Sequence, residues 1–189
     1  MNRYLVDLHV HTALSPCASE EMTPPAIVDL AVRLGLDVIA VSDHNTTKNA
    51  TAVRRAAADR LVVLAGMEIT TAEEVHVLGI FPDEARAAAA GEAVLATLPE
   101  TAAEIRAFGQ QYLMDEQGRI LGTEKRLLSG ASGLNLAEAV AMVRSFGGLA
   151  IPSHIDRPSF GIFSQLGLFP TDVQFDAVEV TTRGLASPQ

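Results

Sequence analysis

The sequence predicts an α/β fold with parallel strands. Short apolar segments alternate with amphipathic segments along most of the chain, and glycines and polar residues separate them. Four of the five histidines come at the carboxyl end of an apolar segment or just past it. Strands that alternate with helices are typical of parallel sheets, in which helices form the crossover connections.

The predicted strands are the short apolar segments. Residues 4–10 form the first of them. The others are 37–42, 61–65, 75–81, 149–153 and 177–181. Each is the length of an ordinary strand, and turn-forming residues flank most of them.

The predicted helices show apolar residues at helical spacing. Thr23 precedes two prolines, a pattern typical of an N-cap and first helical turn, and the helix continues as far as Gly35. A polar start at residues 45–47 leads into a second helix over 48–58. A later helix includes Leu136 and ends at Gly147-Gly148.

Residues 82–134 interrupt this alternation. The stretch 84–96 is rich in alanine and helix-prone, and 110–122 indicates a hairpin that turns near Gln117-Gly118. We interpret 82–134 as an insertion of helices plus a hairpin within a single domain that spans residues 1–189. We expect it to cover the mouth of the site or to shape access to it.

Composition narrows the class of protein. With 189 residues, 48% hydrophobic and 20% charged, the chain is expected to bury a globular core. It has no apolar run of 18 residues, so we expect no membrane span. The net charge of −9 disfavours long nucleic acid as a partner, although bound metal ions would let an acidic protein accept phosphates. Cys17 is the only cysteine and the first residues resemble no secretion signal, so we expect a cytoplasmic location.

The histidines and one glutamate form a candidate metal site. Alternation along a strand puts Asp7, His9 and His11 on one face. It also puts His44 on the same face of its strand as Ala40 and Ser42, Glu68 on the same face as Leu64 and Gly66, and His154 on the same face as Ala150 and Pro152. His76 is the exception, because it starts its predicted strand. Imidazole and carboxylate ligands suit zinc, manganese and iron, and ligands in parallel α/β folds gather at the carboxyl ends of strands.

The motifs around these residues are Asp-Leu-His9-Val-His11-Thr, Ser-Asp43-His44-Asn, Gly-Met-Glu68-Ile, His76 and Pro-Ser-His154. In this order they resemble the PHP (polymerase and histidinol phosphatase) superfamily over nearly the whole chain. Ser15-Pro16-Cys17 and Asp156-Arg157-Pro158-Ser159-Phe160 look like a subgroup of small stand-alone bacterial proteins described as metal-dependent phosphoesterases.

The resemblance implies a distorted (β/α)7 TIM-like barrel with up to three divalent metal ions, zinc, manganese or iron, at its mouth. It implies that His9 and His11 bind one ion, that Glu68 bridges two, that His76 and His154 bind a neighbouring ion, and that His44 contributes to a third position. Pro16 stands where some relatives carry an acidic ligand of that third ion.

The family usually closes its site with an Asp-x-His pair on a seventh strand, and no such pair follows His154. We therefore expect this chain to lack two ligands and the last barrel strand. The open edge would favour association into oligomers.

The expected activity is hydrolysis of a phosphate ester by a hydroxide that paired metal ions, about 4 Å apart, activate. Glu68, His44 and Arg157 are the expected catalytic residues, Arg157 by gripping the phosphate. The expected substrate is a small phosphorylated molecule, a nucleotide or a short oligonucleotide. Two alternatives stay open, namely a degenerate PHP domain that serves as a regulatory or binding module and a metal hydrolase of the amidohydrolase type.

Several residues keep two interpretations. Arg157 and Arg183 suit phosphate binding or surface ion pairs. Asp7 and Asp43 suit either orientation of imidazole rings or capping of strand ends. Glu179 we expect to make a buried hydrogen bond, and Cys17 we interpret as a loop residue rather than a nucleophile.

Overall fold

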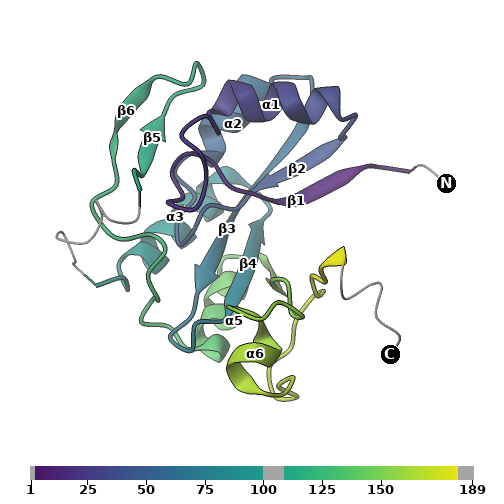
Figure 1. The fold of residues 1–189 in the computed structure, drawn as a ribbon, viewed down its shortest axis with the longest axis vertical. Helices are drawn as coiled ribbons and strands as arrows, with labels where there is room; N and C mark the ends of the chain where they lie inside the picture. Colours follow the sequence, from purple (N-terminus) through teal and green to yellow (C-terminus); the bar gives the residue numbers. More distant parts are fainter. Residues whose placement is uncertain (1–2, 100–108, 183–189) are drawn as a thin grey trace.

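The computed structural model describes residues 3–99 and 109–182, which form an α/β fold around a curled, half-barrel sheet (Figure 1). The five strands of this sheet lie in the order β1-β2-β3-β4-β7. They are β1 (Val6–Val10), β2 (Val38–Val41), β3 (Val62–Thr70), β4 (His76–Phe81) and β7 (Leu149–Pro152). A separate two-stranded hairpin consists of β5 (Tyr112–Met114) and β6 (Ile120–Thr123), and confirms the hairpin predicted around Gln117-Gly118.

Helices cover one face of the sheet. They are α1 (Pro24–Arg33), α2 (Ala50–Ala57), α3 (Glu84–Leu95), α5 (Leu136–Ser145) and the short α6 (Ile162–Leu166). The predicted start of α1 is confirmed, because the Thr23 hydroxyl accepts a hydrogen bond from the Ala26 N–H at 3.4 Å. Asn135 and Glu138 form a reciprocal capping box at the start of α5. None of the described helices is long and apolar enough to cross a membrane.

Two apolar clusters hold the helices against the sheet. The cluster under α1 and α2 includes Ile27, Val28, Ile39 and Val53. The larger cluster, under α3 and α5, is formed by Met67, Ile69, Val75, Val77, Phe81, Ala87, Ala90, Val94, Leu136, Ala139, Val140, Val143, Ala150 and Ile162. Helix α3, from the segment predicted as an insertion, therefore packs on the main sheet.

The prediction of parallel strands is wrong for β4. Strands β1, β2 and β3 are parallel, but β4 runs antiparallel to both β3 and β7. Only residues 71–75 connect β3 to β4, whereas a parallel crossover needs a dozen or more residues. Because β4 is reversed, His76 at its start pairs with Thr70 at the end of β3. His76, the one histidine at the start of its predicted strand, therefore lies at the same end of the sheet as the other four histidines.

The predicted strand over 177–181 is also wrong, since the described residues there form no regular ladder. The segment nevertheless runs beside β7. The Glu179 N–H donates to the Pro152 carbonyl at 3.1 Å, and the Asp176 N–H donates to the Ala150 carbonyl at 3.0 Å. Pro152 has no N–H that could donate a hydrogen bond back to this segment, and the Ala150 N–H donates to the Asp176 side chain instead of to a backbone carbonyl. The proline therefore interrupts the pairing.

Candidate metal centre

All five histidines converge on the carboxylate of Glu68. His9 lies on β1 and His11 just past it, His44 follows β2, His76 starts β4, and His154 follows β7. The nitrogen-to-oxygen distances are 3.2 Å for His9, 3.3 Å for His11, 3.3 Å for His44, 2.9 Å for His76 and 3.3 Å for His154. Glu68 itself is 1% exposed. The predicted ligand residues therefore surround one buried carboxylate.

Strand pairing continues beyond β2 to bring His44 to this point. His44 forms an isolated parallel bridge with Glu68. The Glu68 N–H donates to the Asp43 carbonyl at 3.0 Å, and the Asn45 N–H donates to the Glu68 carbonyl at 2.9 Å. These backbone bonds fix the spacing between the His44 ring and the Glu68 side chain.

The strict alternation predicted for β1 is wrong. The register shifts between Asp7 and Val10, so Leu8 packs with the inner cluster of Ala40, Leu78, Ile80 and Ile151, whereas Val10 packs with the helix-side cluster. Such a bulge places successive residues irregularly. Asp7 accepts a hydrogen bond from the His9 backbone N–H at 3.1 Å and contacts no imidazole ring in the described interactions.

The alternation predicted for His154 is wrong too, although the residue does reach the site. Ala150 belongs to the helix-side core, and the inner-facing neighbour is Ile151. The chain turns after Pro152, and His154 adopts a φ of 29°, a left-handed conformation that non-glycine residues rarely take. Backbone strain of this kind is often found at functional sites.

The ring of His11 is oriented through Ser15 and Asp43. The Ser15 hydroxyl donates to Asp43 at 2.7 Å and accepts from the His44 N–H at 3.0 Å. Since its one proton goes to Asp43, it must accept from Nδ1 of His11, which lies 2.9 Å away. Nε2 of His11 then presents a lone pair to Glu68. Thr12 also donates to Asp43, whose pKa burial raises.

Glu179 orients His9, a role that the sequence did not reveal. Its two oxygens lie 3.1 Å and 3.0 Å from Nδ1 of His9, and it also accepts the His154 N–H at 2.9 Å. Burial opposes ionisation of Glu179, but His9 outweighs it and lowers the pKa of this carboxyl. Burial likewise opposes the charged form of His9, but its hydrogen bond to Glu179 and its attraction to Glu68 outweigh burial and raise the pKa of His9 to about 10. Without a metal ion, His9 therefore holds a proton between two carboxylates.

Several other buried polar atoms of the site have no hydrogen-bond partner. Burial raises the pKa of Glu68, but the imidazoles around it outweigh this effect and hold the pKa well below its ordinary value. Burial lowers the pKa of His44 to about 3, so this ring is neutral. Among the described residues, the buried side-chain atoms here that make no hydrogen bond are Nδ1 of His44, Nδ1 of His76, both ring nitrogens of His154 and Oε1 of Glu68.

Lone pairs that face a carboxylate at about 3 Å without aligned hydrogen bonds need a cation between them. An unsatisfied buried polar atom costs roughly 1–3 kcal/mol, so several together would be strongly unfavourable without a ligand. Two groups of described residues that contain Glu68 have ligand atoms within 4.8 Å of one another, namely His9-His11-Glu68 and His44-Glu68-His76. Glu68 belongs to both. The donor set of imidazoles and a shared carboxylate therefore fits divalent metal ions.

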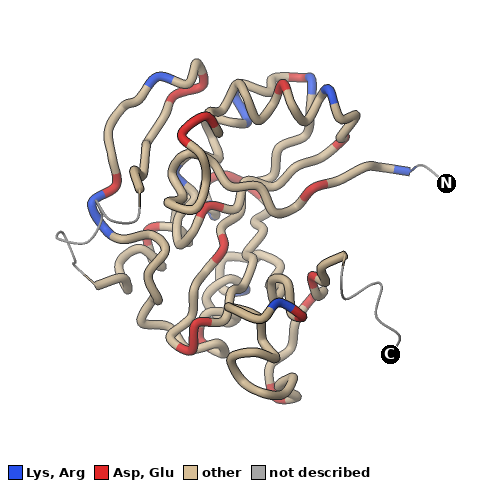
Figure 2. Tube along the Cα trace, viewed as in Figure 1, with Lys and Arg blue, Asp and Glu red and all other residues tan. Residues whose placement is uncertain are grey.

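The cluster opens into a cavity of about 670 Å³. The rest of its wall is formed by Asp7, Cys17, Ser129, Arg157, Phe160, Glu179 and Thr181. Phe160 stacks on His76 with ring centroids 4.5 Å apart and an interplanar angle of 18°. Among the described residues, Arg157 is the only basic side chain other than histidine in this wall, and Arg183 lies outside the described residues. Figure 2 shows the lysines and arginines of the described chain in short, separate stretches, with aspartates and glutamates between them.

The sequence profile of the PHP domain matches residues 7–128. This chain belongs to the PHP domain family. The match includes His9, His11, His44, Glu68 and His76, and confirms the resemblance seen in the motifs. No curated protein matches the sequence.

Solved structures resemble this PHP domain in fold. A putative metal-dependent phosphoesterase from Bifidobacterium adolescentis has a TM-score of 0.63 at 20% identity, with 97% of this chain and 79% of that chain covered. The lesion-specific endonuclease Q from Pyrococcus furiosus has a TM-score of 0.71 at 19% identity, with 98% and 43% covered. Endonuclease Q in complex with a 27-mer duplex that has an abasic lesion at the active site has a TM-score of 0.67 at 19% identity, with 92% and 41% covered. This chain thus spans less than half of the endonuclease Q chains.

Proposed function

We propose that this PHP domain is a metal-dependent phosphoesterase that hydrolyses a phosphate ester of a small molecule, a nucleotide or a short oligonucleotide. The observation that carries the proposal is the convergence of five imidazole rings on the buried, ionised Glu68. Divalent ions bound there would supply positive charge for the phosphate and an activated water as nucleophile. Membership of the PHP family and the fold shared with a putative phosphoesterase support this reaction class.

The proposed site contains metal ligands and residues that orient those ligands. We propose that His9, His11 and Glu68 hold one ion, that His76 and His154 hold a neighbouring ion with Glu68 as the bridge, and that His44 contributes to a third position. Glu179 keeps His9 oriented, and Ser15 with Asp43 keeps His11 oriented. Partners of this kind fix which ring nitrogen faces the metal.

Arg157 is proposed to bind the phosphate. It lies on the loop after β7, is exposed, and lines the cavity beside the histidines. Among the described residues no carboxylate forms an ion pair with it, so the interpretation as a surface ion pair has no support there. A guanidinium matches two phosphate oxygens at once, which would orient the ester toward the metal ligands.

The structure gives the amidohydrolase alternative little support. A lysine that bridges two metal ions would have to reach Glu68, but Lys48 lies 2.7 Å from Glu124 and 3.7 Å from Glu92. Lys125 is exposed on the segment after β6, and neither lysine lines the cavity. We therefore favour esters of phosphate over amides.

We also propose that the half-barrel sheet belongs to a seven-stranded PHP barrel, because the segment around Glu179 lies where a further strand would follow β7. We propose a cytoplasmic location, in keeping with the unpaired Cys17. The exposed Tyr4, Leu5 and Val6 along the free edge of β1 support association through that edge, which light scattering would measure.

The test is turnover of a panel of substrates by metal-free protein reloaded with Mn²⁺ or Zn²⁺. The panel contains an aryl phosphate, nucleoside monophosphates, a short single-stranded oligonucleotide, an abasic duplex and a cyclic amide. Metal-dependent hydrolysis of the first three is expected, with release of phosphate from the monoesters and of nucleotides from the oligonucleotide. Stoichiometric metal without turnover would favour a binding module. Cleavage of the duplex alone would place the chain functionally with endonuclease Q and overturn the small-substrate proposal.

A further inference from the structure

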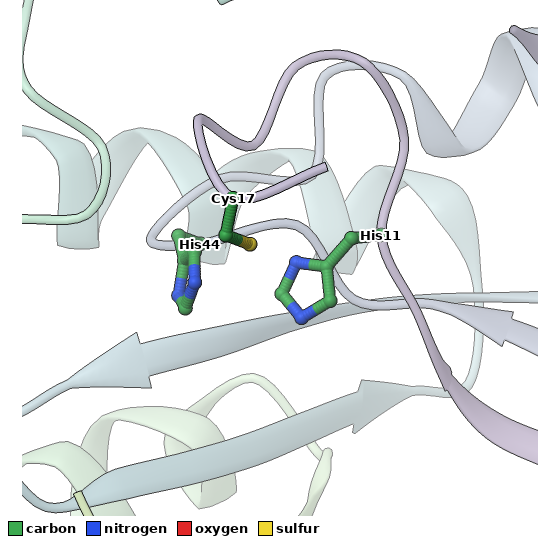
Figure 3. Close-up of side chains that lie close together, drawn as sticks. All are labelled: His11, Cys17 and His44. Carbon is green, nitrogen blue, oxygen red and sulfur yellow. The ribbon is translucent and has the colours of Figure 1, made fainter. Parts of the chain in front are cut away.

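Cys17 was interpreted from the sequence as a loop residue, but the structure places its thiol beside two of the proposed ligands. Ligand atoms of His11, Cys17 and His44 all lie within 4.8 Å of one another. In Figure 3 the sulfur lies between the two imidazole rings. We propose that Cys17, as a thiolate, is a ligand of a divalent metal ion at this end of the cavity, together with His44 and His11. The inference rests on the proposed function only for the presence of divalent ions.

The turn that carries Cys17 is held firmly in place. The Ser15 N–H donates to the Thr12 carbonyl at 3.0 Å, and the Ala18 N–H donates to the Ser15 carbonyl at 2.9 Å. The buried carboxylate of Asp43 binds both Thr12 and Ser15. Because Asp43 directly precedes His44, these bonds attach the turn with the thiol to the strand end that carries the imidazole.

His44 independently indicates a ligand at this place. Its residue is 6% exposed, and its Nδ1 is buried without any hydrogen-bond partner. The nearest charged atom is Oε2 of Glu68, at 3.3 Å, in a geometry that forms no hydrogen bond. The His44 ring, which has this unpartnered buried nitrogen, lies in one group with a thiol and a second imidazole, and these are donors that zinc prefers.

The residue before Cys17 explains why the sequence did not reveal this ligand. Pro16 stands where some relatives carry an acidic ligand, and its ring offers no donor atom. The structure places the sulfur of the next residue in the cavity wall instead. Sulfur in place of oxygen changes the metal preference, because thiolates favour zinc and cobalt over manganese and magnesium. Binding also releases the thiol proton to solvent, since the thiolate is the form that binds the metal.

The test uses the full chain, in which every thiol signal comes from Cys17, the only cysteine. Metal-free protein is loaded with Co²⁺, and the near-ultraviolet absorption that a sulfur-to-cobalt bond produces is recorded. We expect this band in the parent protein and its loss in Cys17→Ser, while visible cobalt absorption from the other ligands remains. Cobalt bound in stoichiometric amount without the band would overturn the proposal.

A second measurement on the unmodified protein needs no variant. At mildly alkaline pH, a chromogenic disulfide reagent should react with Cys17 at least about tenfold more slowly after loading with Zn²⁺ than in metal-free protein, because the coordinated thiolate is no longer available. A chelator should restore the rate. His44→Ala should abolish the protection, whereas His154→Ala, outside this group of ligands, should retain it. Equal reactivity in the metal-free and zinc-loaded protein would overturn the proposal.

The two proposals fail separately. Metal-dependent phosphoester hydrolysis with an unprotected Cys17 would overturn the thiolate ligand alone. A protected Cys17 in a protein without hydrolysis of any phosphate ester would overturn the phosphoesterase function alone.

Discussion

Replacement of Glu179 by glutamine tests how the site orients its ligands. Glu179 contacts Nδ1 of His9 with both oxygens, at 3.1 Å and 3.0 Å, and leaves Nε2 to face Glu68 at 3.2 Å. Glutamine keeps the size of the side chain and one oxygen acceptor but removes the charge. We expect His9 to become a weaker and less fixed ligand.

The magnitude follows from the kind of hydrogen bond. A charge-assisted hydrogen bond contributes roughly 1.5–3 kcal/mol and a neutral one roughly 0.5–1.5 kcal/mol, so the exchange costs about 1–1.5 kcal/mol. This corresponds to about a tenfold loss of metal affinity, the lower end of the roughly 10–100-fold range for such orienting partners. The lower end is appropriate because the Glu179 side chain is 33% exposed and solvent screens its charge.

The assay is competition for Zn²⁺ between the protein and a chromogenic chelator. Glu92→Gln is the matched control, because its side chain is 67% exposed and its only described ion pair is with Lys48. Proton titration of His9 by NMR in the metal-free protein gives a second readout, and its pKa should fall from about 10 in Glu179→Gln. Unchanged zinc affinity and an unchanged His9 titration would refute the assigned orientation, as would an equal loss in the control.

Three further outcomes are expected. Combined His9→Ala and His11→Ala should remove bound metal and abolish turnover, measured by elemental analysis and phosphate release; full activity would contradict the ligand assignment. Arg157→Gln should raise KM more than it lowers kcat, with the exposed Arg60→Gln as control. An unchanged KM would show that Arg157 does not bind the phosphate. Metal-free protein should be most stable near pH 6.5 in thermal unfolding. The raised pKa of His9 means that its contribution is lost as pH rises from 6.5 toward 10, and the lowered pKa of His44 means that stability falls as pH drops from 6.5 toward 3. Stability that rises steadily up to pH 10 would contradict the shift of His9, and stability that falls steadily from pH 3 would contradict the shift of His44.

The sequence predicted the elements better than their arrangement. Caps such as Thr23 and most of the apolar segments depend on local physics, and these elements formed as expected, whereas the predicted strand over 177–181 did not. The reversal of β4 depends on the five residues that separate β3 from β4, a length that excludes a crossover. This short connection was not apparent from the sequence, because the predicted strand ended at residue 65 and β3 extends to Thr70. The missing ladder beside β7 depends on Pro152, and its effect became visible only once the neighbouring segment was placed.

The candidate site was predictable by residue type but not by geometry. Imidazoles near strand ends indicated a metal site, and the five rings did converge on Glu68. Alternation failed at the bulge of β1 and at the turn before His154, because both depend on tertiary register. The orienting residues Ser15 and Glu179 lie 4 and 170 positions from the rings they contact. No periodicity in the sequence connects partners at such separations.

The most direct test of the metal centre is an anomalous difference map of zinc-loaded crystals. Peaks should lie about 2.0–2.2 Å from the Glu68 oxygens and from nitrogens of the surrounding histidines. A map in which zinc binds only elsewhere, while Glu68 forms direct hydrogen bonds with protonated imidazoles, would contradict the metal centre.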